Sequence, residues 1–298
     1  MEYPWVRVRR MTRRPALRRL VRSVRTRPDE LVPYLRVPVE DPGRAAERLA
    51  EQAVERGHAA VYLAPTARRR DSEGTEAWRS DAPLVQAVHA ARAAAPELAL
   101  FAELDLAVFH RSGRPGALTD GLIDAETAHE ALGKSGITLG EAGVDVIGLR
   151  GLVDGGVGAL REALDEADLD RIAILSFSAD LHSPFAELRP ATADKAADLL
   201  DPLDPGAILR QAEVDVSEGA DLLGVQPSLL AQDVLRDLAE EHQLPLVARL
   251  SDQEAKVLEM TARSGAASAE EVASAVHGAL QRAGARLVVT PWALEPEE

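Results

Sequence analysis

The sequence contains no cysteine, only three lysines and few aromatic residues. The absence of cysteine excludes a disulfide scaffold, thiolate zinc sites and a cysteine nucleophile. Aromatic residues make up 3% of the chain, which is too few for a surface that stacks nucleic-acid bases on rings. No apolar run reaches the roughly 18–20 residues that a membrane-spanning helix needs, so we expect no membrane partner. No signal segment opens the chain, and we therefore expect a cytoplasmic protein.

Charge is distributed unevenly along the chain. Residues 1–28 hold ten arginines and a single acidic residue, Glu2. When these are taken from the totals of 34 basic and 49 acidic residues, 24 basic and 48 acidic residues remain. A basic segment can bind nucleic acid, but the acidic remainder would repel it. We therefore expect residues 1–28, the arm, to pack on an acidic surface of its own or a neighbouring subunit, and we expect no nucleic-acid partner.

After the arm, eight short apolar segments alternate with segments of helical periodicity. The apolar segments are nearly continuous in Val, Ile, Leu and Ala, as is typical of parallel strands buried on both faces. Eight strand–helix units predict an α/β fold, a (β/α)8 TIM barrel over residues 29–298. A doubly wound sheet is the alternative, but no Gly-x-Gly-x-x-Gly loop is present. The expected strands are Leu31–Val37, Ala59–Ala64, Leu98–Leu106, Val144–Leu149, Ile172–Phe177, Ala220–Val225, Leu246–Leu250 and Leu287–Thr290.

Acidic residues follow the ends of two expected strands, where the chemistry of such a barrel takes place. Glu103 and Asp105 lie at the end of the third strand, and Asp180 follows the fifth. Carboxylates that converge in a small, partly buried cup can work as an acid/base pair. His182 lies two residues beyond Asp180 and is a candidate general base. These four residues are the candidate catalytic groups.

Arginines at two other strand ends leave an alternative open. Arg150 follows the fourth strand and Arg249 ends the seventh. They either bind a small anionic substrate or neutralise the carboxylates in a structural network of ion pairs. Ser251 and Glu254 form the Ser-x-x-Glu pattern of a helix capping box, which predicts a helix start after the seventh strand.

Several motifs occur in order along nearly the whole chain and resemble the porphobilinogen synthase (5-aminolevulinate dehydratase) family of tetrapyrrole biosynthesis. The resemblance implies a TIM barrel whose N-terminal arm wraps a neighbouring subunit, and hence a homo-oligomer. The motifs are RRPALRRLVR at Arg13–Arg22, EGTEAW at Glu73–Trp78, VDGGVGALREALD at Val153–Asp165, ILSF at Ile174–Phe177, EGADLL at Glu218–Leu223 and RAGARLVVT at Arg282–Thr290.

The chain departs from this family at the two lysines on which the family binds its substrate as Schiff bases. The segment that carries the first lysine here ends in Asp180, and the second position is occupied by Gln226. Neither a carboxylate nor a primary amide forms an imine, which needs an amine of lowered pKa.

The family's metal segment is altered as well. Of three ligand positions only Asp105 remains, because Ala107 and Pro115 offer no ligand atoms. One carboxylate does not hold zinc, so we expect no resident metal. A weakly bound Mg²⁺, held through water by Glu103 and Asp105, is the alternative.

The resemblance also implies positions that hold the carboxylates of the substrate. Arg189 matches the family's first carboxylate-binding arginine, and Lys195 falls at the second. The family's substrate-binding serine falls near Ser251 or Asp252, and Gln226 takes the place of a substrate-contacting lysine. Together with Arg150 and Arg249, these residues are the candidate substrate-binding groups.

Three functions follow from these observations. The first is a repurposed barrel enzyme that acts on a small anionic molecule by carboxylate acid/base chemistry, without Schiff-base lysines and without making porphobilinogen. The second is a pseudoenzyme that assembles with, or regulates, an active porphobilinogen synthase. The third is a porphobilinogen synthase. The missing lysines favour the first two.

Overall fold

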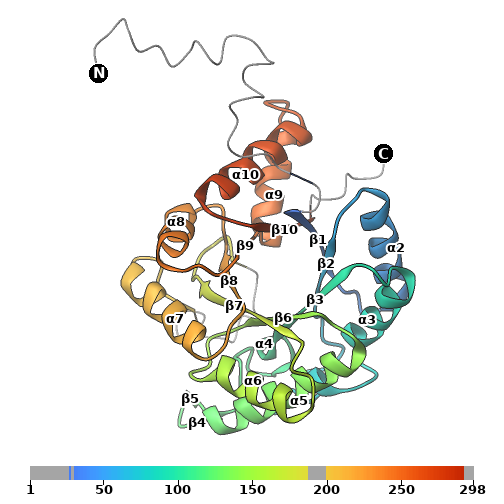
Figure 1. Ribbon diagram of the computed structural model, residues 1–298, viewed down its shortest axis with the longest axis vertical. Helices are drawn as coiled ribbons and strands as arrows, with labels where there is room; N and C mark the ends of the chain where they lie inside the picture. Colours follow the sequence, from blue (N-terminus) through green and yellow to red (C-terminus); the bar gives the residue numbers. More distant parts are fainter. Residues whose placement is uncertain (1–26, 28–29, 187–198, 292–298) are drawn as a thin grey trace, which may run out of the picture.

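Eight parallel strands close into a barrel in the computed structural model, which describes residues 27, 30–186 and 199–291 (Figure 1). Around the barrel the strand order is β1-β10-β9-β8-β7-β6-β3-β2. This architecture confirms the predicted (β/α)8 TIM barrel. The barrel strands are β1 (Leu31–Arg36), β2 (Ala60–Ala64), β3 (Ala99–Asp105), β6 (Val146–Arg150), β7 (Ala173–Asp180), β8 (Leu222–Gln226), β9 (Leu246–Arg249) and β10 (Leu287–Thr290).

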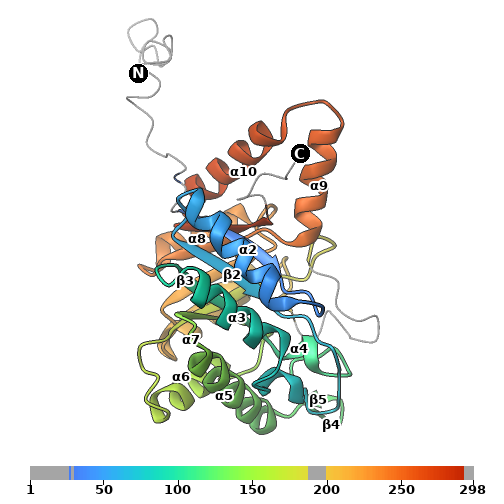
Figure 2. The same cartoon turned by 90° about the vertical axis from the view of Figure 1, so that its right-hand side faces the viewer.

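Helices surround the barrel and connect successive strands (Figures 1 and 2). Two helices, α9 and α10, follow β9 and form a hairpin at one side of the barrel (Figure 2). The helices are α2 (Pro42–Glu55), α3 (Pro83–Ala94), α4 (Leu106–Phe109), α5 (Ala125–Ala142), α6 (Gly156–Glu166), α7 (Pro205–Ser217), α8 (Gln232–Glu241), α9 (Asp252–Arg263) and α10 (Ala269–Ala283), with the 3₁₀ turn η3 (Thr75–Trp78).

A small antiparallel hairpin lies outside the barrel, in the connection between β3 and α5. Its strands are β4 (Leu118–Thr119) and β5 (Leu122–Ile123). The sequence did not predict this hairpin or the short helices η3 and α4, because they lack the apolar periodicity by which longer elements are recognised.

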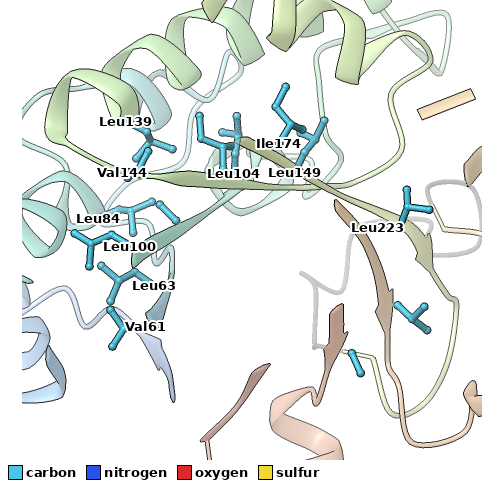
Figure 3. Close-up of a cluster of buried hydrophobic side chains, with 14 of the residues drawn as sticks. Val61, Leu63, Leu84, Leu100, Leu104, Leu139, Val144, Leu149, Ile174 and Leu223 are labelled. Carbon is cyan, nitrogen blue, oxygen red and sulfur yellow. The ribbon is translucent and has the colours of Figure 1, made fainter. Parts of the chain in front are cut away.

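The hydrophobic core consists of two layers, because side chains alternate between the two faces of each strand. The outer layer fills the space between the sheet and the helices; Val61, Leu63 and Leu100 on the strands point toward the helices in the close-up of Figure 3. The inner layer fills the barrel itself, with Tyr62 and Phe177 among its largest members. Because both faces of each strand are buried, the strands read as continuous apolar runs.

The fifth barrel strand extends further than the sequence suggested. The apolar run stops at Phe177, whereas β7 continues to Asp180. The pairing of β7 with β8 shifts register between Ser176 and Ala179, as at a β-bulge, and resumes with Ala179 opposite Val225 and Asp180 opposite Gln226. The bulge therefore changes the alternation near the end of the strand, at the residue that matters most for the site.

The arm lies almost entirely outside the described residues, so its predicted packing on a subunit surface stays a prediction. The same holds for its division from the barrel at residue 28. Within the described ranges, no helix is long and apolar enough to cross a membrane.

Candidate functional site

Arg150 lies at the centre of a cluster of carboxylates at the carboxyl end of the barrel. Its Nη1 is 3.3 Å from Glu103 Oε1 and 3.7 Å from Asp105 Oδ2, and its Nη2 is 3.3 Å from Asp180 Oδ2. All four side chains are at most 3% exposed. One guanidinium therefore forms ion pairs with three acidic side chains from two different strands, β3 and β7.

Arg249 and Gln226 extend this cluster across the barrel. Arg249 Nη2 lies 3.3 Å from Glu103 Oε2, and its Nη1 donates to Gln226 Oε1. The amide of Gln226 then donates through Nε2 to Asp180 Oδ1 at 3.0 Å. With both amide atoms engaged, the orientation of Gln226 is fixed by its neighbours. Two arginines, three carboxylates and one amide thus form a single network, which we call the mouth network.

Two tyrosines form the floor of the mouth network on the side of the barrel interior. The guanidinium carbon of Arg249 lies 4.8 Å from the ring centre of Tyr34 and 5.6 Å from that of Tyr62, which are cation–π distances. The hydroxyl of Tyr62 donates to Glu103 Oε2 at 3.1 Å. Burial, and after it the charge of Glu103, raise the pKa of the Tyr62 phenol, so the hydroxyl keeps its proton and remains a donor.

Two glycines make room for the aromatic rings beneath the network. A Cβ on Gly148 of β6 would lie 2.7 Å from the Tyr62 hydroxyl, and a Cβ on Gly224 of β8 would lie 2.6 Å from the ring of Phe177. Both distances are shorter than atoms tolerate, so neither strand could carry a side chain there without displacing a ring. Gly148 of β6 therefore leaves room for the tyrosine that contacts Glu103, and Gly224 of β8 leaves room for Phe177.

Strand register brings the charged residues to one level of the barrel. Asp105 of β3 lies opposite Arg150 of β6, and Asp180 of β7 lies opposite Gln226 of β8. Since carboxyl ends of parallel strands meet at the same end of a barrel, residues far apart in sequence converge there. The structure thus brings together six predicted site residues, and their arrangement is the ion-pair network that the sequence left as the alternative. Their roles in catalysis or substrate binding remain predictions.

The other predicted site residues lie elsewhere. His182 is exposed, and its backbone amide donates to Leu200 O at 2.9 Å. Ser251 caps α9, as its sequence pattern predicts, and Asp252 pairs with Arg36 of β1 at 3.0 Å. The predictions for Arg189 and Lys195 fall outside the described residues.

The ion pairs within the mouth network disfavour metal binding by its carboxylates. Glu103 and Asp105, the predicted water-mediated Mg²⁺ ligands, both contact Arg150, whose positive charge opposes a cation at the same oxygens. Asp105 Oδ1 also accepts the backbone N–H of Ala107 at 3.0 Å. Over residues 30–186 and 199–291, no three His, Asp or Glu side chains are placed to hold a metal ion. Among these described residues, the carboxylates of the mouth network therefore do not fit a zinc site.

Sequence reasoning missed Tyr34, Tyr62 and Arg36. The tyrosines lie within the apolar runs of β1 and β2, where they do not stand out as polar residues. The signal that identifies them is strand alternation: Tyr34 and Tyr62 are partners across β1 and β2, so their rings point to the same face. Arg36 follows Tyr34 by two residues and is the last residue of its strand.

Comparisons with known proteins give a consistent result over nearly the full length of the chain. A model of the family "Delta-aminolevulinic acid dehydratase" matches residues 5–297. A delta-aminolevulinic acid dehydratase of Bacillus subtilis is 28% identical over 97% of this chain and 96% of the relative. One from Synechocystis is 30% identical with the same coverage of both chains. The delta-aminolevulinic acid dehydratase of Toxoplasma gondii, solved with its reaction product porphobilinogen, superposes with a TM-score of 0.90 at 29% identity, over 97% of this chain and 90% of that chain.

These findings correct the functional expectation from the sequence. The residues Asp180 and Gln226, in place of the family's two lysines, favoured a repurposed enzyme or a pseudoenzyme that makes no porphobilinogen. The comparisons contradict both and support the third function, porphobilinogen synthase. Agreement with the family along residues 5–297 outweighs the two substituted positions.

Proposed function

Because the chain belongs to the delta-aminolevulinic acid dehydratase family, we propose that it converts delta-aminolevulinic acid to porphobilinogen. The observation that carries this proposal is the match to the family model over residues 5–297. The fold supports it, since the TM-score of 0.90 was obtained with a structure that contains porphobilinogen. The proposed location is the cytoplasm, which fractionation of cells that express the tagged chain would test.

The mouth network restricts how this reaction can proceed. Asp180 and Gln226 carry no amine, so a Schiff base cannot form at the ends of β7 and β8. Lys134 lies on α5 and pairs with Glu130 at 2.7 Å, and Lys256 is exposed on α9. The third lysine of the chain is Lys195, at a position where the family resemblance implies a substrate-carboxylate contact, as it does at Arg189. Any lysine-bound intermediate is therefore proposed on one of these three lysines.

The test combines turnover with trapping of a covalent intermediate. Purified full-length chain is incubated with delta-aminolevulinic acid, porphobilinogen is measured, and a parallel sample is reduced with borohydride and mapped by mass spectrometry. We expect porphobilinogen and an adduct on one lysine. Lys134→Arg, Lys195→Arg and Lys256→Arg are matched variants: the one at the adduct site loses product and adduct, and the other two keep both. Absence of product from a folded sample would overturn the proposal.

We propose further that the chain works without bound zinc. Its supporting observation is that the ligand positions implied by the resemblance are Asp105, Ala107 and Pro115, of which only Asp105 has a ligand atom in its side chain. Elemental analysis after dialysis should show far less than one zinc per chain, and added Mg²⁺ should change activity only weakly. One zinc per chain would contradict this.

The proposed assembly is a homo-oligomer held through the arm. Residues 1–28 carry ten arginines, and the rest of the chain carries 48 acidic and 24 basic residues. Opposite charges attract at low ionic strength, which favours binding of the arm to an acidic subunit surface. Light scattering should show a dimer or larger species. Deletion of residues 1–28, or added salt, should shift it toward monomer, because salt screens the attraction. A monomeric full-length chain in low salt would refute the assembly.

A further inference from the structure

Three of the barrel strands end in arginine, and the three side chains differ in their access to water. β1 ends at Arg36, β6 at Arg150 and β9 at Arg249. The side chains of Arg150 and Arg249 are 2% and 0% exposed and belong to the mouth network, whereas that of Arg36 is 35% exposed. A carboxylate that approaches the carboxyl end of the barrel from solution can therefore contact Arg36 without displacing a member of the mouth network.

Strand alternation places Arg36 on the inner face of the barrel. Tyr34 of β1 belongs to the inner layer of the core, whereas Leu31 and Leu35 pack against the outer layer. Arg36 follows Tyr34 by two residues, so it lies on the inner face as well, one level nearer the mouth. It therefore lies on the same side of β1 as the tyrosine ring that contacts the guanidinium of Arg249.

The strands on either side of β1 explain why Arg36 is exposed. On β2 its partner is Ala64, whose side chain is a single methyl group. On the other side, β10 ends at Thr290, which lies opposite Pro33, so β1 continues for three residues beyond the end of β10. Neither neighbouring strand therefore places a large side chain beside Arg36.

Asp252, at the start of α9, orients Arg36 from across the end of β10. The Nε of Arg36 lies 3.0 Å from Asp252 Oδ2, and the aspartate side chain is 32% exposed. Ion pairs with this degree of exposure are weak, because water competes for both partners. A guanidinium also presents several N–H groups in one plane, which matches the two oxygens of a carboxylate. The pair therefore fixes the direction of the Arg36 side chain and still allows a ligand carboxylate to join or replace Asp252.

We propose that Arg36 binds the carboxylate of the substrate at the mouth of the barrel and thereby selects small carboxylic acids over their uncharged analogues. This inference rests on the proposed function, in which the substrate, delta-aminolevulinic acid, carries a carboxylate. It gives Arg36 a role for which the sequence had suggested the buried Arg150 and Arg249. The negative charge of Asp252 partly cancels that of the arginine and so limits the affinity for the ligand.

The experiment is calorimetric titration of the full-length chain with levulinic acid and with its methyl ester. Levulinic acid is the substrate without its amino group, so it cannot be converted to a pyrrole, and the ester lacks the negative charge. We expect the wild type to bind the acid on the order of tenfold more tightly than the ester, as for a hydrogen bond to a charged group. Arg36→Gln should lose this preference. A wild type that binds neither ligand or both equally, or an R36Q protein that keeps the preference, overturns the proposal.

Arg161→Gln is the matched control at the opposite, amino end of the barrel. Arg161 of α6 is 20% exposed and pairs with Asp221, which is 49% exposed, so the variant also removes an arginine from a partly exposed pair. R161Q should keep the wild-type preference for the acid. Loss of the preference in both R161Q and R36Q would show that the effect is not local to Arg36 and would contradict the proposal.

Asp252→Asn tests the proposal in a protein that keeps Arg36. Without the competing carboxylate, the acid should bind severalfold more tightly than to the wild type, while the affinity for the ester stays the same. Absence of this gain contradicts the role of Arg36. None of these titrations requires turnover. The expected binding results without porphobilinogen formation would overturn the proposed function alone, and porphobilinogen formation without them would overturn the role of Arg36 alone.

Discussion

The two ends of the barrel both carry arginine–carboxylate pairs, but in opposite surroundings. At the carboxyl end, Arg150 and Arg249 are 2% and 0% exposed. At the amino end, Arg92 and Arg161 are 28% and 20% exposed, and their partners Asp145 and Asp221 are each 49% exposed. Water therefore helps to solvate the charges of the amino-end pairs, whereas the charges of the mouth network are stabilised by one another.

The amino-end pairs form two copies of one local arrangement. Arg92 of α3 donates to Asp145, Gly143 O and Leu98 O, and Asp145 accepts the N–H of Leu100 in β3. The same contacts recur two barrel strands later, between α6 and β7. There Arg161 donates to Asp221, Gly219 O and Ile172 O, and Asp221 accepts the N–H of Ile174 in β7.

The amino-end pairs are a local arrangement that occurs twice, whereas the mouth network joins side chains from strands that are far apart in the sequence. Each amino-end pair attaches a helix to the next strand through backbone carbonyls, so it can be lost without leaving a buried charge. In the mouth network each charge is compensated by side chains from other strands, so removing one member affects all of them.

The largest effect is expected from Arg150→Ala. It leaves Glu103, Asp105 and Asp180 buried without their shared cation, which should lower the free energy of unfolding by about 3–5 kcal/mol. Urea unfolding measures this, with Arg79→Ala as the control, because Arg79 and its partner Asp81 are 60% and 56% exposed. A loss equal to that of the control would show that the mouth network does not stabilise the barrel as one unit.

An intermediate effect is expected from Gly148→Ala. The added methyl group meets the Tyr62 hydroxyl, and such overpacking costs about 1–3 kcal/mol. Tyr62→Phe removes that hydroxyl, and with it the hydrogen bond to Glu103. The double variant should therefore be more stable than the sum of the single losses predicts, as a double-mutant cycle measures. Strict additivity would mean that Gly148 is not needed for the placement of the ring.

The smallest effect is expected from Asp221→Asn at the amino end. The amide oxygen can still accept from Ile174 N, so only the ionic part of the contact with Arg161 is lost, worth less than about 1 kcal/mol. Because this pair is partly exposed, 1 M salt should remove the difference from the wild type. The loss in R150A should persist in the same salt; equal salt sensitivity at both ends would refute the comparison.

Much of the fold was predictable because it depends on local patterns. Near-continuous apolar runs identified all eight barrel strands, and the Ser251–Glu254 pattern predicted the start of α9. The strand-end rule selected Glu103, Asp180 and Arg150, which do converge. It failed at Tyr62, since a tyrosine in an apolar run gives no sign of its contact until the neighbouring strand is placed beside it.

The sequence by itself determined that the chain folds as a (β/α)8 barrel and which charged residues end its strands. Both follow from the order of apolar and polar residues along the chain. The tertiary structure alone decided how those charges are paired. The register shift in β7 directs Asp180 toward Arg150, and Gly148 admits the ring of Tyr62 beneath Glu103. Pairing depends on distances of a few ångströms between strands remote in sequence, and these are set by packing rather than by any local pattern.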